Sequence, residues 1–234
     1  MPAARPLALL FDLDGTLIDS IELLLSSMRH AFATRGIAAP SDARWIEGIG
    51  TPLVTQLREM VCDDAEVAAL VDAYRAHQRL HHDRLVSAYP GVVNTLRTLR
   101  ARGHQMAIVT SKADELAARG VAHAGLASFL DTIVGCDSCT MHKPEPEPVF
   151  VALARLERAP GEAIFVGDSP HDIASGNAAG VATVAATWGP FSRAQLQVAR
   201  PTHWLEDITA LPTLVARLDQ PASIGEPRAP GDAG

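Results

Sequence analysis

Short apolar runs recur along this chain, and a polar or glycine-containing loop follows each of them. The runs cover residues 7–11, 105–110, 131–135, 163–167 and 181–186. They lack the polar–apolar alternation of a half-buried strand, so they are typical of parallel strands covered on both faces. Helical patterns lie between them, at residues 92–103, 114–125 and 146–159. This order of elements predicts an α/β fold with a doubly wound, Rossmann-like parallel sheet.

The interval 17–88 contains no strand-like run and has helical periodicity instead. Its first helix is marked by apolar residues at helical spacing: Leu23, Leu24, Met28, Ala31 and Phe32. Further helices are expected over residues 51–61 and 64–83. Asp19 and Glu22 stand three residues apart before the first helix, which predicts a capping box with Asp19 as the N-cap.

We therefore expect an α/β core made of residues 1–16 and 89–218. Residues 17–88 form an inserted α-helical cap over the carboxyl edge of the sheet. The last stretch, residues 219–234, is rich in Pro, Gly and Ala and has almost no large apolar residue, so it is expected to be a disordered tail.

Charge and hydropathy exclude several classes of partner. The net charge of −7 disfavours binding to nucleic acid or to an anionic membrane surface. No stretch approaches the ~20 apolar residues that span a bilayer, and the N-terminus lacks a complete signal peptide, so we expect a cytoplasmic protein. The three cysteines do not suggest a disulfide framework. Cys136 and Cys139 form a CxxC before His142, but a structural zinc site usually needs four ligands.

Polar side chains collect where the predicted strands end. Ligands of open α/β sheets bind outside the carboxyl ends of the strands, so these residues are expected to share one region. In chain order they are Asp12, Asp14, Thr110, Ser111, Lys112, Lys143, Asp168 and Asp172.

This set of side chains fits phosphoryl chemistry. Carboxylate oxygens suit Mg²⁺, which keeps several waters and leaves room for a phosphate oxygen. A lysine and a hydroxyl can neutralise and hydrogen-bond a phosphoryl group. One aspartate can act as a nucleophile, and a second one two residues later can act as general acid and then as general base.

Each residue alone also has an ordinary structural role. Asp14 precedes a glycine and could belong to a turn, and Lys143 could be a solvated surface lysine. Asp168, Thr110 and Ser111 could each cap the helix that follows. The coincidence of all of them at one sheet edge favours a functional site.

Four motifs, "DLDGT", "VTSK", "HKPEPEP" and "GDSPHD", occur in an order and spacing that resembles the haloacid dehalogenase-like hydrolase superfamily. The resemblance covers roughly residues 7–215 and is strongest to the phosphoglycolate phosphatase-like branch with a helical cap after the first motif. It implies that Asp12 is the nucleophile and Asp14 the general acid and base. It also implies that Thr110 and Ser111 bind the phosphoryl group and that Lys143 neutralises it.

The resemblance further implies a Mg²⁺ site. Its ligands would be Asp12, Asp168 and the backbone carbonyl of Asp14, with Asp172 bonding to metal-bound water. The stretch "GIGTP", which contains Gly50 and Thr51, falls where such proteins carry a substrate-selecting cap loop.

Several activities of this superfamily remain open. A dehalogenase would need neither Asp14 nor the "GDSPHD" carboxylates, and a β-phosphoglucomutase-like mutase typically has Val and His where this chain has Thr16 and Leu24. An inorganic pyrophosphatase would share every core motif. A non-catalytic binding module would usually have lost the nucleophile or the lysine. We therefore expect a Mg²⁺-dependent phosphatase, monomeric or homodimeric, that hydrolyses a small phosphomonoester through an aspartyl-phosphate intermediate. The substrate is expected to be phosphoglycolate-like or a sugar phosphate.

Overall fold

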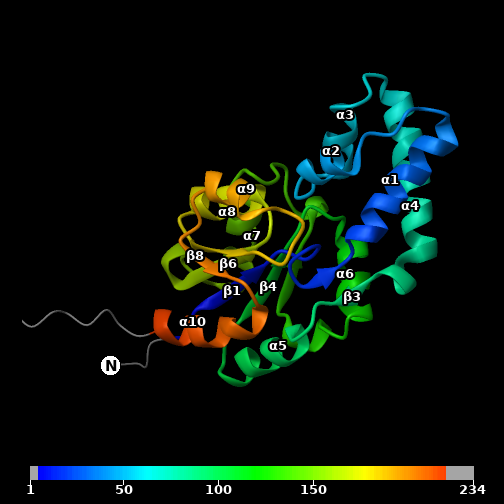
Figure 1. Ribbon diagram of the computed structural model, residues 1–234. Coiled ribbons are helices and arrows are strands. Elements are labelled where there is room, and N and C mark those ends of the chain that lie inside the picture. Colours follow the sequence, from blue (N-terminus) through cyan, green and yellow to red (C-terminus); the bar gives the residue numbers. More distant parts are fainter. Residues whose placement is uncertain (1–4, 220–234) are drawn as a thin grey trace, which may run out of the picture.

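The computed structural model describes residues 5–219, and its core is a six-stranded parallel sheet (Figure 1). The strand order is β5-β4-β1-β6-β7-β8. The strands are β1 (Ala8–Phe11), β4 (Met106–Val109), β5 (Thr132–Val134), β6 (Ala163–Gly167), β7 (Ala182–Ala186) and β8 (His203–Leu205). The predicted doubly wound α/β fold is confirmed.

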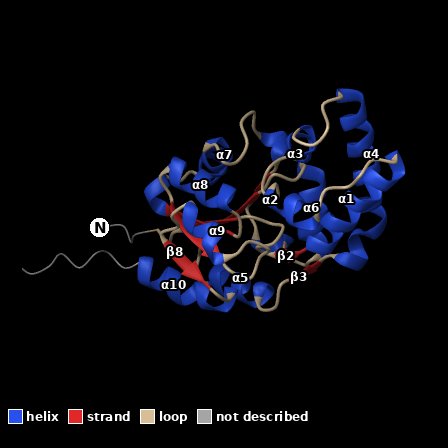
Figure 2. Cartoon of the chain, turned by 45° about the horizontal axis from the view of Figure 1, so that its top comes forward, coloured by secondary structure: helices blue, strands red, loops and turns tan. Residues whose placement is uncertain are grey.

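Helices cover both faces of the sheet (Figure 2). They are α5 (Val92–Ala101), α6 (Asp114–His123), α7 (Glu147–Leu156), α8 (Pro170–Ala179), α9 (Arg193–Val198) and α10 (Leu211–Leu218). Short 3₁₀ turns occur at Ala127–Phe129, Cys136–Ser138, Pro160–Glu162 and Ile208–Ala210. Leu9 and Phe11 belong to a hydrophobic cluster on one face of the sheet, with residues of α5, α6 and α10. Ala8 and Leu10 belong to a second hydrophobic cluster on the other face, with residues of α7. Burial of both faces explains why β1 is apolar throughout.

The strand order reverses at β1, which pairs with β4 on one side and with β6 on the other. The carboxyl ends of these three strands therefore flank a topological switch point, where open α/β sheets form their binding crevice. The residues that follow the three strands are Asp12, Thr110 and Asp168.

A helical lobe, residues 21–85, stands beyond this edge of the sheet (Figure 1). It consists of α1 (Ile21–Arg35), α2 (Asp42–Glu47), α3 (Leu53–Arg58) and α4 (Asp64–Leu85), and the long helices α1 and α4 pack on each other. A two-stranded antiparallel ribbon, β2 (Ile18–Asp19) and β3 (Ser87–Ala88), joins the lobe to the core. We propose that this lobe acts as the cap expected for residues 17–88.

The prediction that Asp19 caps the first helix is wrong. Asp19 lies in β2 and pairs with Ser87, so its backbone belongs to the ribbon, and Ser20 takes the N-cap position. The Ser20 hydroxyl donates to Asp14 and makes no capping bond. The ribbon also corrects the expectation that residues 17–88 contain no strand.

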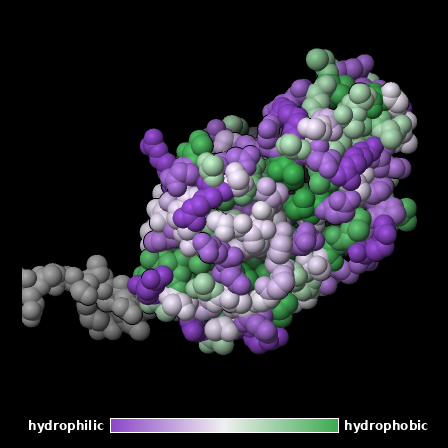
Figure 3. All heavy atoms as spheres, in the orientation of Figure 1, coloured by the Kyte–Doolittle hydropathy of each residue, from purple (hydrophilic) through white to green (hydrophobic). Residues whose placement is uncertain are grey.

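Within the described residues, no helix is long and apolar enough to cross a membrane. Hydrophilic and hydrophobic residues are mixed over the face shown in Figure 3, with hydrophobic ones gathered where the helical lobe meets the core. The predicted disordered tail, apart from Asp219, lies outside the described residues.

Candidate active site

The loop after β1 brings the first two aspartates to the sheet edge. Asp12 extends the strand, since its backbone N–H donates to the carbonyl of Val166 in β6 at 2.9 Å. Gly15 then takes a left-handed conformation with φ of 88°. A Cβ atom at Gly15 would lie 2.5 Å from Oδ2 of Asp168, so the backbone can approach this carboxylate only because residue 15 is glycine.

Gly15→Ala should therefore destabilise the fold more than glycine replacement in an open turn does. Gly103 is the matched control, because its φ is 87° and a Cβ atom there would make only an ordinary contact, at 3.8 Å from Pro6. We expect Gly103→Ala to lower the free energy of unfolding by about 1–2 kcal/mol from the left-handed backbone alone. Steric overlap with Asp168 should add about 1–3 kcal/mol for Gly15→Ala. Equal losses in urea unfolding would contradict the close approach.

Lys143 joins two carboxylates, that of the nucleophile candidate Asp12 and that of Asp172. Its Nζ atom donates to Asp12 at 2.7 Å and to Asp172 at 2.5 Å. The lysine is only 3% exposed, which rules out the surface role that its sequence context allowed. A buried ammonium needs such partners, because an unpaired buried charge is strongly destabilising.

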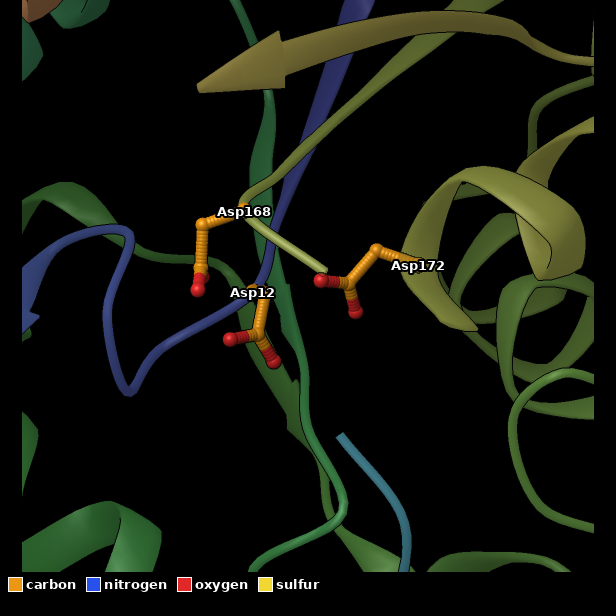
Figure 4. Close-up of side chains that lie close together, drawn as sticks. All are labelled: Asp12, Asp168 and Asp172. Atoms are coloured by element: carbon orange, nitrogen blue, oxygen red, sulfur yellow. The ribbon is translucent and has the colours of Figure 1, made fainter. Parts of the chain in front are cut away.

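Asp168 completes a cluster of carboxylates that point toward one another (Figure 4). One carboxylate oxygen from each of Asp12, Asp168 and Asp172 lies within 4.8 Å of the others. Oδ1 of Asp168 accepts from the Thr16 hydroxyl at 2.5 Å, but its buried Oδ2 has no hydrogen-bond partner. Asp168 does not cap α8, since Ser169 is the N-cap and forms a reciprocal capping box with Asp172.

The electrostatics of this cluster favour an additional cation. Burial raises the pKa of the Asp12 carboxyl to about 7, against the attraction of Lys143. Burial, and then repulsion by Asp12, raise the pKa of Asp168 well above its usual range. Burial alone would lower the pKa of Lys143, but attraction by Asp12 and Asp172 outweighs it and raises this pKa. One lysine thus leaves the negative charge of the cluster incompletely compensated.

Asp14 is held apart from this cluster by other partners. Its Oδ1 accepts from the Ser20 hydroxyl at 2.5 Å and from Lys112 Nζ at 2.6 Å. The Asp14 carboxylate is thereby oriented toward the cavity described next, while its backbone carbonyl as a metal ligand stays a prediction. Sequence reasoning noted Lys112 only as a polar residue at the strand end, and it gave no role to Ser20 or Thr16.

A cavity of about 130 Å³ opens in front of these residues, and we call it the active-site cavity. Core and helical lobe both line it. Its lining includes all of the predicted substrate-binding residues together with both aspartates of the first motif: Asp12, Asp14, Gly50, Thr51, Thr110 and Ser111. Neither Thr110 nor Ser111 caps α6, whose N-cap is Ala113.

The lobe contacts the core at the cavity through the loop around Gly50. The Ser111 hydroxyl donates to the Gly50 carbonyl at 2.5 Å, and His171 Nε2 donates to the Glu47 carbonyl at 3.3 Å. Gly50 has φ of 102°, and a Cβ there would lie 2.7 Å from the Ser169 hydroxyl. Glycine is therefore required for this loop to reach the strand ends.

The cysteines play no part in the carboxylate cluster. Sγ of Cys139 lies 3.6 Å from His142 Nδ1, and Cys136 is among the residues that line the active-site cavity. Burial raises the pKa of the Cys136 thiol to about 11, so it stays protonated at neutral pH. Among the described residues, the group of three or more potential ligands with metal-binding spacing is the aspartate cluster and not the CxxC.

Comparison with known proteins agrees with this geometry. The chain is 44% identical over 176 residues to pyrophosphatase PpaX of Halalkalibacterium halodurans, covering 74% of this chain and 80% of that protein. It is 35% identical over 211 residues to pyrophosphatase PpaX of Bacillus cereus, covering 90% and 97%. The solved structure of a predicted phosphoglycolate phosphatase from Haemophilus somnus has the same fold, with a TM-score of 0.82, 24% identity, and coverage of 90% and 98%.

The model of one protein family matches residues 9–186, which include both aspartates of the first motif, Lys143 and the two later aspartates. The family is described as haloacid dehalogenase-like hydrolase. Motifs, fold and site geometry agree with that match, and the chain belongs to the haloacid dehalogenase-like hydrolase family.

Proposed function

We propose that this protein is a Mg²⁺-dependent phosphohydrolase that transfers a phosphoryl group from a small phosphate compound to Asp12 and then to water. The observation that carries the proposal is the position of Asp12. Its carboxylate lines the active-site cavity, bonds to a buried lysine, and lies within 4.8 Å of two further carboxylates.

The residues present fit Mg²⁺. The buried Oδ2 of Asp168 lacks a partner, and hard carboxylate oxygens are the ligands that this ion prefers. We propose Asp12 and Asp168 as side-chain ligands and the Asp14 carbonyl as a third. Asp172 already bonds to Lys143 and Ser169, which suits it to bonding to metal-bound water and not to the metal itself. When bound, the ion would neutralise charge on the phosphoryl oxygens.

The chain's own residues would carry out two displacements. First, a carboxylate oxygen of Asp12 attacks phosphorus, the bond to the leaving oxygen breaks, and Asp14 gives a proton to that oxygen. Second, Asp14 takes a proton from water, the water oxygen attacks phosphorus, and the carboxylate of Asp12 is released with inorganic phosphate. Lys143 and the Thr110 hydroxyl would stabilise the phosphoryl oxygens in both steps.

The first candidate substrate is a small phosphomonoester. The active-site cavity is lined largely by apolar side chains, which favours a leaving group that contains carbon atoms. Pyrophosphate is the second candidate, because both of the relatives reported above carry the name pyrophosphatase. One assay measures phosphate release from phosphoglycolate, from pyrophosphate and from a phosphate ester whose alkyl group is uncharged. A parallel assay measures halide release from a haloacid, which separates a phosphohydrolase from a dehalogenase.

Metal removal should abolish the activity. We expect no phosphate release in excess chelator, recovery on adding Mg²⁺, and inhibition by Ca²⁺, which prefers more ligands and looser geometry. Mg²⁺ at about 100 times its dissociation constant should also raise the free energy of unfolding by about 2.7 kcal/mol.

Asp168→Asn is the matched variant for the metal experiment, since it keeps the shape of the side chain and removes its charge. It should lose the stabilisation by Mg²⁺ as well as the activity. Full activity of the wild-type protein in excess chelator would overturn the metal dependence.

A further inference from the structure

The active-site cavity has two chemically different parts. Asp12 and Asp14 lie at the end formed by the core strands. Much of the remaining wall is apolar and comes mainly from the helical lobe: Leu24, Trp45, Ile49, Leu53, Tyr74 and Leu116. A phosphoryl group placed at Asp12 would therefore direct its leaving group toward the lobe.

Arg75 of α4 is the charged residue that the helical lobe contributes to that wall. It is half-buried, and it forms no hydrogen bond or ion pair with any of residues 5–219. The other basic residue lining the cavity, Lys112, is already paired with Asp14 at 2.6 Å. Arg75 lowers the pKa of Cys136 against the larger effect of burial, which agrees with a guanidinium beside that cavity residue.

A separate outer groove of about 290 Å³ lies between α4 and α6 and shares Arg75, Ala113 and Leu116 with the active-site cavity. Its other lining residues are the basic Arg79 and Arg119 and the acidic Glu115 and Asp137, and Arg119 is paired with Asp83. The charges of the groove are therefore mixed, and Arg75 is the one basic residue that the groove shares with the active-site cavity.

We propose that Arg75 binds a negative charge on the leaving group, so that the substrates are phosphate compounds whose leaving group is itself an anion. The charge can be a carboxylate or a second phosphoryl group, since a guanidinium binds either one with paired hydrogen bonds. This inference rests on the proposed phosphohydrolase function and assigns the substrate class of the same site.

The leaving group is a better partner for Arg75 than the transferred phosphoryl group is. The transferred group must contact Asp12, where Lys143 and the carboxylate cluster lie, whereas Arg75 belongs to the lobe. A half-buried guanidinium without a partner gains hydrogen bonds when an anion enters, and a neutral leaving group offers no such gain.

The test compares three substrates in matched variants. Phosphoglycolate and ethylene glycol monophosphate have the same length, but the first ends in a carboxylate and the second in a neutral hydroxyl. Pyrophosphate supplies a phosphoryl group as the anion. We expect Arg75→Gln to lower kcat/KM by about 10- to 100-fold for whichever of the two anionic substrates the wild-type protein prefers. For the neutral ester the change should stay within about twofold, and Arg75→Lys should recover part of the loss.

Arg79→Gln is the control, because it removes the same charge one helical turn along α4 from an exposed residue that is not among those lining the active-site cavity. It should leave the ratio of kcat/KM between anionic and neutral substrates unchanged. Thermal unfolding of both variants should match the wild-type protein, which separates binding from folding.

The outcomes separate the two proposals. Suppose that the wild-type protein releases phosphate, but Arg75→Gln lowers kcat/KM equally for anionic and neutral substrates, or for neither. This result overturns the role of Arg75 and leaves the proposed phosphohydrolase function standing. An equal effect of Arg79→Gln on the substrate ratio overturns the role of Arg75 as well, because general charge would then explain the result. A wild-type protein that releases phosphate from none of the three substrates overturns the proposed function and this inference with it.

Discussion

Asp12→Asn should remove turnover almost completely, by on the order of 10⁴-fold or more, as expected for loss of a covalent nucleophile. An amide cannot form the acyl phosphate, so both displacements are blocked. The experiment measures phosphate release at saturating Mg²⁺ and, in parallel, the label that stays on the protein when a radioactive substrate is quenched with acid. Wild-type protein should retain label and the variant should retain none.

The fold of the Asp12→Asn protein should survive, which makes the result interpretable. Lys143 keeps its bond to Asp172, and the buried cluster loses a charge that burial and neighbouring carboxylates already disfavour. We therefore expect a free energy of unfolding in the absence of metal close to that of the wild-type protein. A well-folded variant that still turns over substrate or retains label would contradict a nucleophilic role for Asp12.

The sheet was predictable because both of its faces are buried. Continuous apolar runs mark β1, β4, β5, β6 and β7, and each observed strand lies within its predicted run. β8 (His203–Leu205) was not predicted, because it begins with a histidine directly after Pro201 and Thr202, so no apolar run marks it. The two-residue strands β2 and β3 carry no pattern at all, since so short a ribbon depends on tertiary contacts.

Residue types at strand ends predicted which side chains gather, but not how they pair. The aspartates, Lys143 and the hydroxyl residues lie where parallel strands end, so the topology alone brings them together. The Lys112–Asp14 ion pair spans 98 positions, and nothing in the local sequence distinguishes Lys112 from a surface lysine. Arg75 was missed for the same reason, because its place at the cavity depends on how the lobe packs against the core.

Asp14→Asn should slow the first displacement according to how strongly the leaving group needs a proton. An alkyl phosphate such as phosphoglycolate expels a basic alkoxide, so loss of a general acid should cost about 10²–10⁴-fold. A nitrophenyl phosphate expels a stable phenolate and should lose much less. The rate of Asp12 phosphorylation, measured by rapid quench for both esters in both proteins, gives this comparison directly.

The second displacement supplies the internal control for Asp14→Asn. The phosphorylated Asp12 is the same species whichever ester formed it, so loss of the general base should slow its hydrolysis equally for both. The Ser20 hydroxyl and Lys112 both contact Oδ1 of Asp14, and an asparagine oxygen can accept the same two bonds, so the side chain should keep its position. Equal loss of the first rate for the alkyl and aryl esters would contradict the general-acid role and leave Asp14 as a residue that positions Lys112 and the loop.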